Sequence, residues 1–393
     1  MKRVFSKKML TVVLGIVCFF TITGVFDSVS AAENELTIQS KIVEPGATEF
    51  AKSDFGYSLS AILAAEKIGT SPENFVLSEP FVIEGSNQGE IYFPVLLDNN
   101  VEYVYILIQD GDGKYSSSVS RFLAEEIQEL RANESIDLES YPVTFFLKNN
   151  NIFYKQNNEV TLLWESPIRP DVQEPEALEN FVTNETEEFS IKSLSNEIDF
   201  VEQPLVEDDT QSIPNPLQRG VVIDTNYIMI DFVCRETQGN VPWCAAYATA
   251  WILSNKTNPT LTYAYDVMKH AYPNATFSEL ITKTASYDQI AAFARSKGAS
   301  PIVTPTTLSG DNVRTLLKNG KPLYIGLDGI SGDYLGKTHA MSLFGWVKQG
   351  NNESYYVWNP WNNYVTVAST NGSSLTVPVS GGAFTWKRTI YNM

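Results

Sequence analysis

Apolar and polar residues are arranged along the first half of the chain in a way that predicts short strands with two helices. Residues 91–97 and 101–108 are apolar runs separated by a polar turn at 98–100, which predicts two strands joined as a hairpin. The other elements predicted here are helices over 58–67 and 121–130 and strands over 143–147, 152–154 and 160–164. We therefore expect a β-rich domain over residues 32–166.

The second half of the chain has helices first and strands afterwards. The predicted helices cover 244–254, 265–271, 287–297 and 312–318. The predicted strands cover 323–327, 339–347, 354–358, 364–368, 375–379 and 384–390. Helices followed by an antiparallel sheet make an α+β domain, which we place at residues 220–393. Two domains also fit a chain of 393 residues.

Residues 167–219, between these domains, are acidic and punctuated by proline. The carboxylates from Asp171 to Asp209 face almost no basic residues. Such a segment buries too little apolar surface to order itself fully. We expect a linker that proteases reach, in which apolar clusters such as 189–191 are the parts able to dock on a neighbour.

The first residues have the pattern of a secretory signal peptide. Basic Lys2-Arg3 and Lys7-Lys8 precede an apolar run over 9–25, and the small residues Ala31-Ala32 follow where a signal peptidase cuts. We expect residues 1–31 to be removed on export, leaving an extracellular product without a membrane anchor. A permanent anchor is the alternative, because the apolar run is only marginally long enough to span a bilayer.

Charge and cysteine count narrow the classes of function. A formal net charge of -18 argues against nucleic-acid binding, which needs clustered Lys and Arg. Beyond the signal peptide only Cys234 and Cys244 remain, with two histidines, so neither a metal nor another cofactor is expected. Secreted proteins often pair their cysteines. A chain of this size does not need such a bond for its core, so we expect both thiols to be free.

The candidate chemistry centres on Cys244. Pro242 and the run 245–251 predict a helix that starts at this cysteine, and a helix N-terminus favours thiolate. We therefore expect a lowered thiol pKa; an inert buried cysteine is the alternative. Of the two histidines, His339 begins an apolar strand and is the candidate base. His270 ends a helix and is expected to be structural or exposed.

Two amides complete a set of groups suited to nucleophilic catalysis. Gln238 stands six residues before the thiol, so its side-chain N–H and the backbone N–H of Cys244 are candidate donors to an oxyanion. Asn359 ends a strand that pairs antiparallel with the strand beginning at His339, so its oxygen is expected near the imidazole. Trp361 would shield that bond from water.

These motifs resemble the papain superfamily, and more closely the staphopain family of secreted bacterial cysteine proteases. They are ETQGN at 236–240, WCA at 243–245, HAM at 339–341 and WNPW at 358–361. In papain-type enzymes a tryptophan follows the cysteine directly, whereas here Ala245 follows and Trp243 precedes, as in the staphopain pattern. The similarity covers about the last 175 residues.

The resemblance implies a papain-like catalytic domain with a helical part and an antiparallel sheet or barrel part. It assigns Cys244 as nucleophile, His339 as base and later acid, Asn359 as orienting group and Gln238 as oxyanion donor. It further implies a latent zymogen whose N-terminal propeptide includes the β-rich domain and covers the cleft until the linker is cut, near Arg219-Gly220. The expected partners are protein or peptide substrates and the chain's own propeptide. Whether a small protein inhibitor is a further partner is left open.

Two other functions use the same groups. A Cys–His hydrolase of cell-wall peptides shares the chemistry and the export, although its third group is usually a polar residue without an Asn-x-Trp motif. A catalytically inactive papain-like binding module is the second alternative. A calcium loop at Asp110-Gly-Asp-Gly113 is disfavoured, because the spaced third acid and the closing glutamate are missing.

Overall fold

The computed structural model describes residues 36–85, 90–109, 113–133, 141–148, 151–157, 159–165, 186–191, 221–224, 226–239, 241–256, 260–332, 334–371, 374–379 and 381–393. The predicted signal peptide, most of the Asp110–Gly113 turn, the Arg219-Gly220 bond and most of the acidic linker lie outside these ranges. No helix within them is long and apolar enough to cross a membrane.

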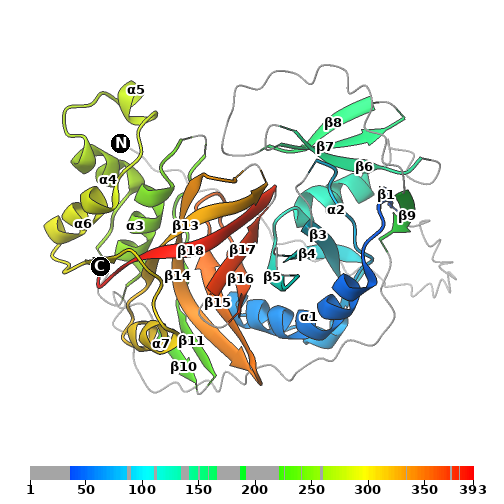
Figure 1. Cartoon of the computed structure of the whole chain (residues 1–393), viewed down its shortest axis with the longest axis horizontal. Coiled ribbons are helices and arrows are strands. Elements are labelled where there is room, and N and C mark those ends of the chain that lie inside the picture. The colour runs from blue at the N-terminus through cyan, green and yellow to red at the C-terminus, as the bar shows by residue number, and fades with distance from the viewer. Residues whose placement is uncertain are drawn as a thin grey trace, which may run out of the picture. The chain divides into compact units, whose positions relative to one another are not determined.

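In the residues that the structure describes, the N-terminal region contains two helices, one 3-10 turn and short strands (Figure 1). In chain order these are β1 (Thr37–Lys41), α1 (Pro45–Glu66), η1 (Pro72–Asn74), β2 (Phe75–Leu77), β3 (Glu90–Leu97), β4 (Asn100–Gln109), β5 (Tyr115–Ser120), α2 (Ala124–Ala132), β6 (Thr144–Lys148), β7 (Asn151–Gln156), β8 (Glu159–Trp164) and β9 (Thr186–Ser190). The predicted strands of this half are all present.

Helix α1 is much longer than the pattern over 58–67 predicts. It begins at Pro45, a residue suited to the first turn, and ends where Lys67 adopts a left-handed φ of 57°. It contains weak helix formers such as Asp54 and Gly56 near its middle. Tertiary packing overrides that weakness, because Ala47, Ala51, Phe55, Leu59 and Ile62 form one fully buried stripe.

The sheet beside α1 is buried on both faces. Phe93 and Tyr105 point into the core that contains α1, whereas Tyr92 and Ile106 point into a second core formed with α2. Burial of both faces explains why β3 and β4 are nearly continuous apolar runs and were predictable from the sequence.

Strand β5 was not predicted, because it is largely serine and most of the side chains that it buries are polar. Ser117 Oγ donates to the Asp54 carboxylate at 2.6 Å, and Tyr105 Oη donates to the same carboxylate at 2.7 Å. Asp54 is itself buried. A hydrogen-bonded carboxylate therefore takes the place of apolar packing on this strand.

The C-terminal region has its helices on one side and a long curved sheet on the other (Figure 1). In chain order the elements are β10 (Val221–Asp224), β11 (Tyr227–Ile230), α3 (Cys244–Asn255), α4 (Ala264–Ala271), α5 (Phe277–Leu280), α6 (Tyr287–Ser296), β12 (Ile302–Thr304), α7 (Gly310–Lys318), β13 (Leu323–Gly332), β14 (Thr338–Gln349), β15 (Asn352–Trp358), β16 (Val365–Asn371), β17 (Ser374–Val379) and β18 (Gly382–Tyr391). The expected mixed α+β class is confirmed for this region, and its predicted helices and strands are present.

The two regions share one sheet. Within the described residues its 13 strands run β10-β11-β14-β13-β18-β17-β16-β5-β4-β3-β2, with β12 and β15 paired off this path. Strand β16 pairs with β17 only at Thr370 and Asn371, and then with β5 at Val367 and Ala368. Ser118 Oγ also donates to Pro378 O of β17 at 3.3 Å. The N-terminal strand β5 therefore lies against both β16 and β17, where these two strands of the C-terminal region no longer pair with each other.

Part of the acidic linker is ordered. Strand β9 pairs antiparallel with β1, with Phe189 opposite Ile38, and Ile191 is buried in the α2 core. The expectation that an apolar cluster at 189–191 docks on a neighbour is therefore confirmed.

Candidate active site

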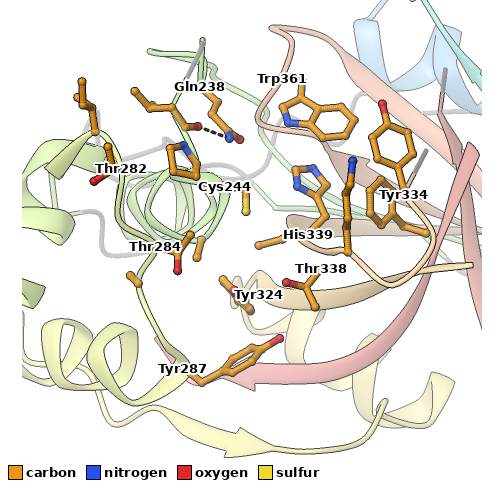
Figure 2. A pocket seen from close by; sticks show the side chains of 18 residues that line it. Gln238, Cys244, Thr282, Thr284, Tyr287, Tyr324, Tyr334, Thr338, His339 and Trp361 are labelled. Atoms are coloured by element: carbon orange, nitrogen blue, oxygen red, sulfur yellow. Dashed lines mark hydrogen bonds between the residues drawn. The ribbon is translucent and has the colours of Figure 1, made fainter. Parts of the chain in front are cut away.

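Cys244 is the first residue of α3 and faces a cavity of about 500 Å³. The indole Nε1 of Trp243 donates to Leu280 O at 2.8 Å and holds the turn in front of the helix. Ser342 Oγ of β14 donates to Ala248 O of the helix at 3.2 Å. The thiol is thus fixed between the helical side and the sheet, and Figure 2 shows its sulfur on the side of His339.

The cavity is lined by both sides of the C-terminal region. Its lining residues are Gln238, Val241, Pro242, Cys244, Ala245, Ile281, Thr282, Thr284, Ala285, Tyr287, Tyr324, Tyr334, Lys337, Thr338, His339, Ala340, Trp361 and Phe384. None of them belongs to the described residues of the N-terminal region.

The side chains of His339 and Asn359 are joined by a hydrogen bond. The imidazole Nε2 lies 2.9 Å from Asn359 Oδ1, and both side chains are buried. Asn359 Oδ1 also accepts the backbone N–H of Trp361 at 3.2 Å. An amide oxygen is an acceptor, so Nε2 carries the proton and Nδ1 is left as the basic nitrogen available to the thiol.

Two aromatic rings enclose the imidazole. The Trp361 ring stacks on His339 at a centroid distance of 4.2 Å and an interplanar angle of 29° (Figure 2). The Phe384 ring lies next to the same imidazole, with the two ring centroids 5.1 Å apart. These rings exclude water from the bond between His339 and Asn359, which strengthens it.

The electrostatics of the pair differ from the sequence-based expectation. Burial raises the pKa of the Cys244 thiol to about 11, although backbone N–H groups at Ala340 and Ala245 oppose that rise. Burial also lowers the pKa of His339 to about 4, against the effect of its bond to Asn359. The prediction of a lowered thiol pKa is therefore wrong for this structure. Both shifts favour the uncharged thiol and imidazole over a thiolate–imidazolium pair.

Gln238 is buried at the edge of the cavity. Its backbone N–H donates to Pro360 O at 2.8 Å, which ties its loop to the residue after Asn359. Its Nε2 donates to Val241 O at 2.5 Å (Figure 2). An amide nitrogen has two N–H groups, so one of them remains for a group bound in the cavity.

The remaining cysteine and histidine lie outside this arrangement. Cys234 is half-buried with its Sγ 3.5 Å from Glu236 O, and both described cysteines are free, as expected. His270 is exposed at the end of α4, where its ring meets the edge of Phe293 at 5.4 Å, also as expected.

The aromatic walls of the cavity were missed from the sequence. Tyr287 comes from α6 and Tyr324 from β13, with their ring centroids 5.8 Å apart. Tyr334, between β13 and β14, also lines the cavity. One local signal was present: a Cβ at Gly326 would lie 2.2 Å from the Tyr287 hydroxyl, so that glycine leaves room for the tyrosine.

Comparison with known proteins agrees with this geometry. Residues 224–393 match the family model for staphopain peptidase C47. The chain is 26% identical to staphopain A of Staphylococcus aureus (strain MRSA252) over 378 residues, covering 91% of this chain and 89% of the relative. It is 22% identical to staphopain B of Staphylococcus aureus (strain MSSA476) over 358 residues, covering 87% and 85%. Residues 224–393 therefore form a peptidase domain of the staphopain family, of the papain-like cysteine endopeptidase type.

Proposed function

We propose that the chain hydrolyses peptide bonds in proteins through Cys244, His339 and Asn359, with Gln238 as an oxyanion donor. The observation that carries the proposal is the 2.9 Å bond between His339 Nε2 and Asn359 Oδ1. That bond leaves Nδ1 for the thiol at the start of α3, in a cavity that both groups line.

The first half of the reaction forms an acyl-enzyme. The Cys244 proton passes to His339 Nδ1 as the sulfur attacks the substrate carbonyl carbon. The oxyanion that develops accepts N–H bonds from Gln238 and from the backbone of Cys244. His339 then gives its proton to the leaving amine, the C–N bond breaks, and a thioester remains on the sulfur.

The second half restores the free enzyme. A water molecule gives a proton to His339 Nδ1 while its oxygen attacks the thioester carbonyl. The C–S bond then breaks, the thiol recovers the proton, and the carboxylic product leaves. Throughout, Asn359 keeps the imidazole in the tautomer and orientation that both proton transfers need.

Labelling with an epoxide thiol inhibitor tests these roles. We expect mass spectrometry to locate the label on Cys244, and Cys244→Ala to abolish cleavage of a denatured protein. Cys234→Ala is the matched control and should keep both labelling and activity. Activity that survives Cys244→Ala, or that chelators abolish, would overturn the mechanism. Release of cell-wall peptides without protein fragments would indicate the other Cys–His hydrolase.

We further propose that the enzyme is secreted as a latent zymogen. Residues 1–31 act as the signal peptide, residues 32–166 form the propeptide domain, and cleavage in the 167–219 linker, near Arg219-Gly220, starts activation. The similarity to staphopain A over 91% of the chain, which includes the N-terminal half, supports this organisation.

Following the secreted protein over time tests latency. We expect a full-length form with little activity, followed by a shorter form whose N-terminus lies in the linker and whose activity is higher. Full activity before any cleavage would overturn the zymogen proposal while leaving the catalytic roles intact.

A further inference from the structure

Exposed apolar side chains gather on one short stretch of the helical side. Five of the twelve exposed large hydrophobic residues among the described ranges lie between positions 261 and 281. They are Leu261, Tyr263, Tyr265, Phe277 and Ile281, and we call them the α4–α5 surface. Phe277 is 62% exposed, an unusual position for a phenylalanine on an ordered element.

Two of these side chains, Tyr265 and Phe277, contact each other, and Phe277 also contacts the turn that carries the thiol. The Phe277 ring lies 6.3 Å from the Tyr265 ring and 6.4 Å from the Trp243 ring. Trp243 directly precedes Cys244. The backbone N–H of Ile281 donates to Phe277 O at 3.1 Å, so Phe277 and Ile281 are held one helical turn apart.

The surface is preformed. A capping box between Thr276 and Glu279 closes the start of α5, with Glu279 accepting the Thr276 N–H at 2.7 Å. Lys269 Nζ donates to Ala275 O at 2.8 Å, and Tyr272 Oη donates to Thr284 O at 2.6 Å. These local hydrogen bonds fix the backbone around α5, which carries Phe277 at the surface.

The surface continues into the cavity. Ile281 belongs to both, because it is 37% exposed and also lines the cavity together with Cys244. Thr282 and Thr284 follow it along the same wall (Figure 2), and α4 lies beside α3 in Figure 1. A polypeptide with its scissile bond at Cys244 therefore meets this surface where it leaves the cavity past Ile281.

We propose that the α4–α5 surface is an exosite for the substrate polypeptide. It binds apolar and aromatic side chains of an unfolded protein several residues away from the scissile bond. The inference rests on the proposed peptidase function, and it specifies the substrate as an extended chain rich in exposed apolar residues. Contact with Phe277 and Tyr265 adds affinity for long substrates only, since a short peptide ends inside the cavity.

The test compares two substrates on the same variants. Tyr265→Ser with Phe277→Ser removes the rings without adding charge, and Ile302→Ser removes an exposed apolar residue of β12 as the matched control. Each variant is made as the full chain and assayed in the form, full-length or matured, in which the parent is active. We expect kcat/KM for a denatured, alkylated protein to fall about tenfold, mainly through KM. For a short fluorogenic peptide, kcat/KM of the double variant should stay within about twofold of the parent. Ile302→Ser should leave kcat/KM unchanged for both substrates.

Several outcomes would overturn the exosite. Equal losses on both substrates would mean that the rings support the cleft itself, and no loss on the protein would mean that the surface binds no substrate. A parent that dimerises in sedimentation, with monomeric variants, would assign the surface to a second copy of the chain. Phe277→Ser alone, with a thermal midpoint matching the parent, repeats the test if the double variant folds poorly. A parent inactive on the short peptide would instead count against the proposed function.

Discussion

The backbone N–H of Ser117 donates a 2.9 Å hydrogen bond to the hydroxyl of Ser369, joining the N-terminal strand β5 to strand β16 of the peptidase. A second bond, from Tyr356 Oη to Ala61 O at 3.0 Å, joins the same two regions. Phe55 of α1 and Tyr356 lie in one hydrophobic core. Backbone pairing and a shared core hold the regions together independently of the segment that connects them.

Cutting the linker should therefore leave a two-fragment complex. After limited proteolysis between residues 192 and 220, we expect both fragments to elute together and to separate only in denaturant. Ser118→Leu should weaken this association, because Ser118 is 2% exposed and sits against Pro378. Ser53→Leu, at an exposed position of α1, is the matched control. Fragments that part on size exclusion without denaturant would contradict this prediction.

Asn359→Ala should lower kcat by about 10²-fold with a small change in KM, because a misoriented imidazole affects the proton transfers more than substrate binding. Asn363→Ala, at an exposed neighbouring position, should behave like the parent. The assay is steady-state cleavage of a short peptide. A change confined to KM would mean that Asn359 shapes the substrate site and leaves the imidazole unaffected.

Gln238→Ala should cost about 10²–10³-fold in kcat, the usual loss when one oxyanion donor is removed. The backbone bond from Gln238 to Pro360 does not depend on the side chain, so the loop should keep its position and KM should change little. Thr282→Ala, which also lines the cavity, is the control. An unaltered kcat in Gln238→Ala would exclude the side chain as a donor.

The spatial proximity of the proposed catalytic groups was predictable, because each stands in a local motif. His339 and Asn359 lie at the ends of adjacent antiparallel strands, and β14 and β15 pair with Ser342 opposite Trp358. Sequence spacing therefore carries the geometry directly. The walls of the cavity were not predictable, since Tyr287 and Tyr324 approach each other only when α6 packs beside β13.

The fold was predictable wherever burial is apolar. Strands β3 and β4 are almost entirely apolar, and their limits agree with the sequence within a residue or two. Strand β5 was missed because Asp54, far away in the sequence, supplies the partner that allows Ser117 to be buried. Local patterns do not contain that information, and the same applies to the polar first half of α1.

His339 should make stability depend on pH below neutrality. Its folded pKa of about 4 lies below the ordinary value of 6.5, so the unfolded chain binds the proton first as the pH falls. The contribution of His339 to the free energy of unfolding is constant above pH 6.5. Between pH 6.5 and 4 it declines by roughly 3 kcal/mol in all. Urea unfolding at several pH values should show that His339→Gln loses less stability than the parent over this range. Parallel curves would contradict the assignment.

Alkylation of Cys244 should report the uncharged pair in the full-length chain. With the pKa of the thiol raised to about 11, the thiolate fraction grows about tenfold per pH unit through neutrality. In a Cys234→Ser background, iodoacetamide labelling should therefore accelerate by about that factor per unit between pH 6 and 9. The same chain unfolded in urea, where burial no longer acts, should label faster at pH 8 because its thiol returns to a pKa of about 8.5. A labelling rate that is flat between pH 5 and 8 would instead reveal a thiolate–imidazolium pair and would contradict the raised pKa of the Cys244 thiol.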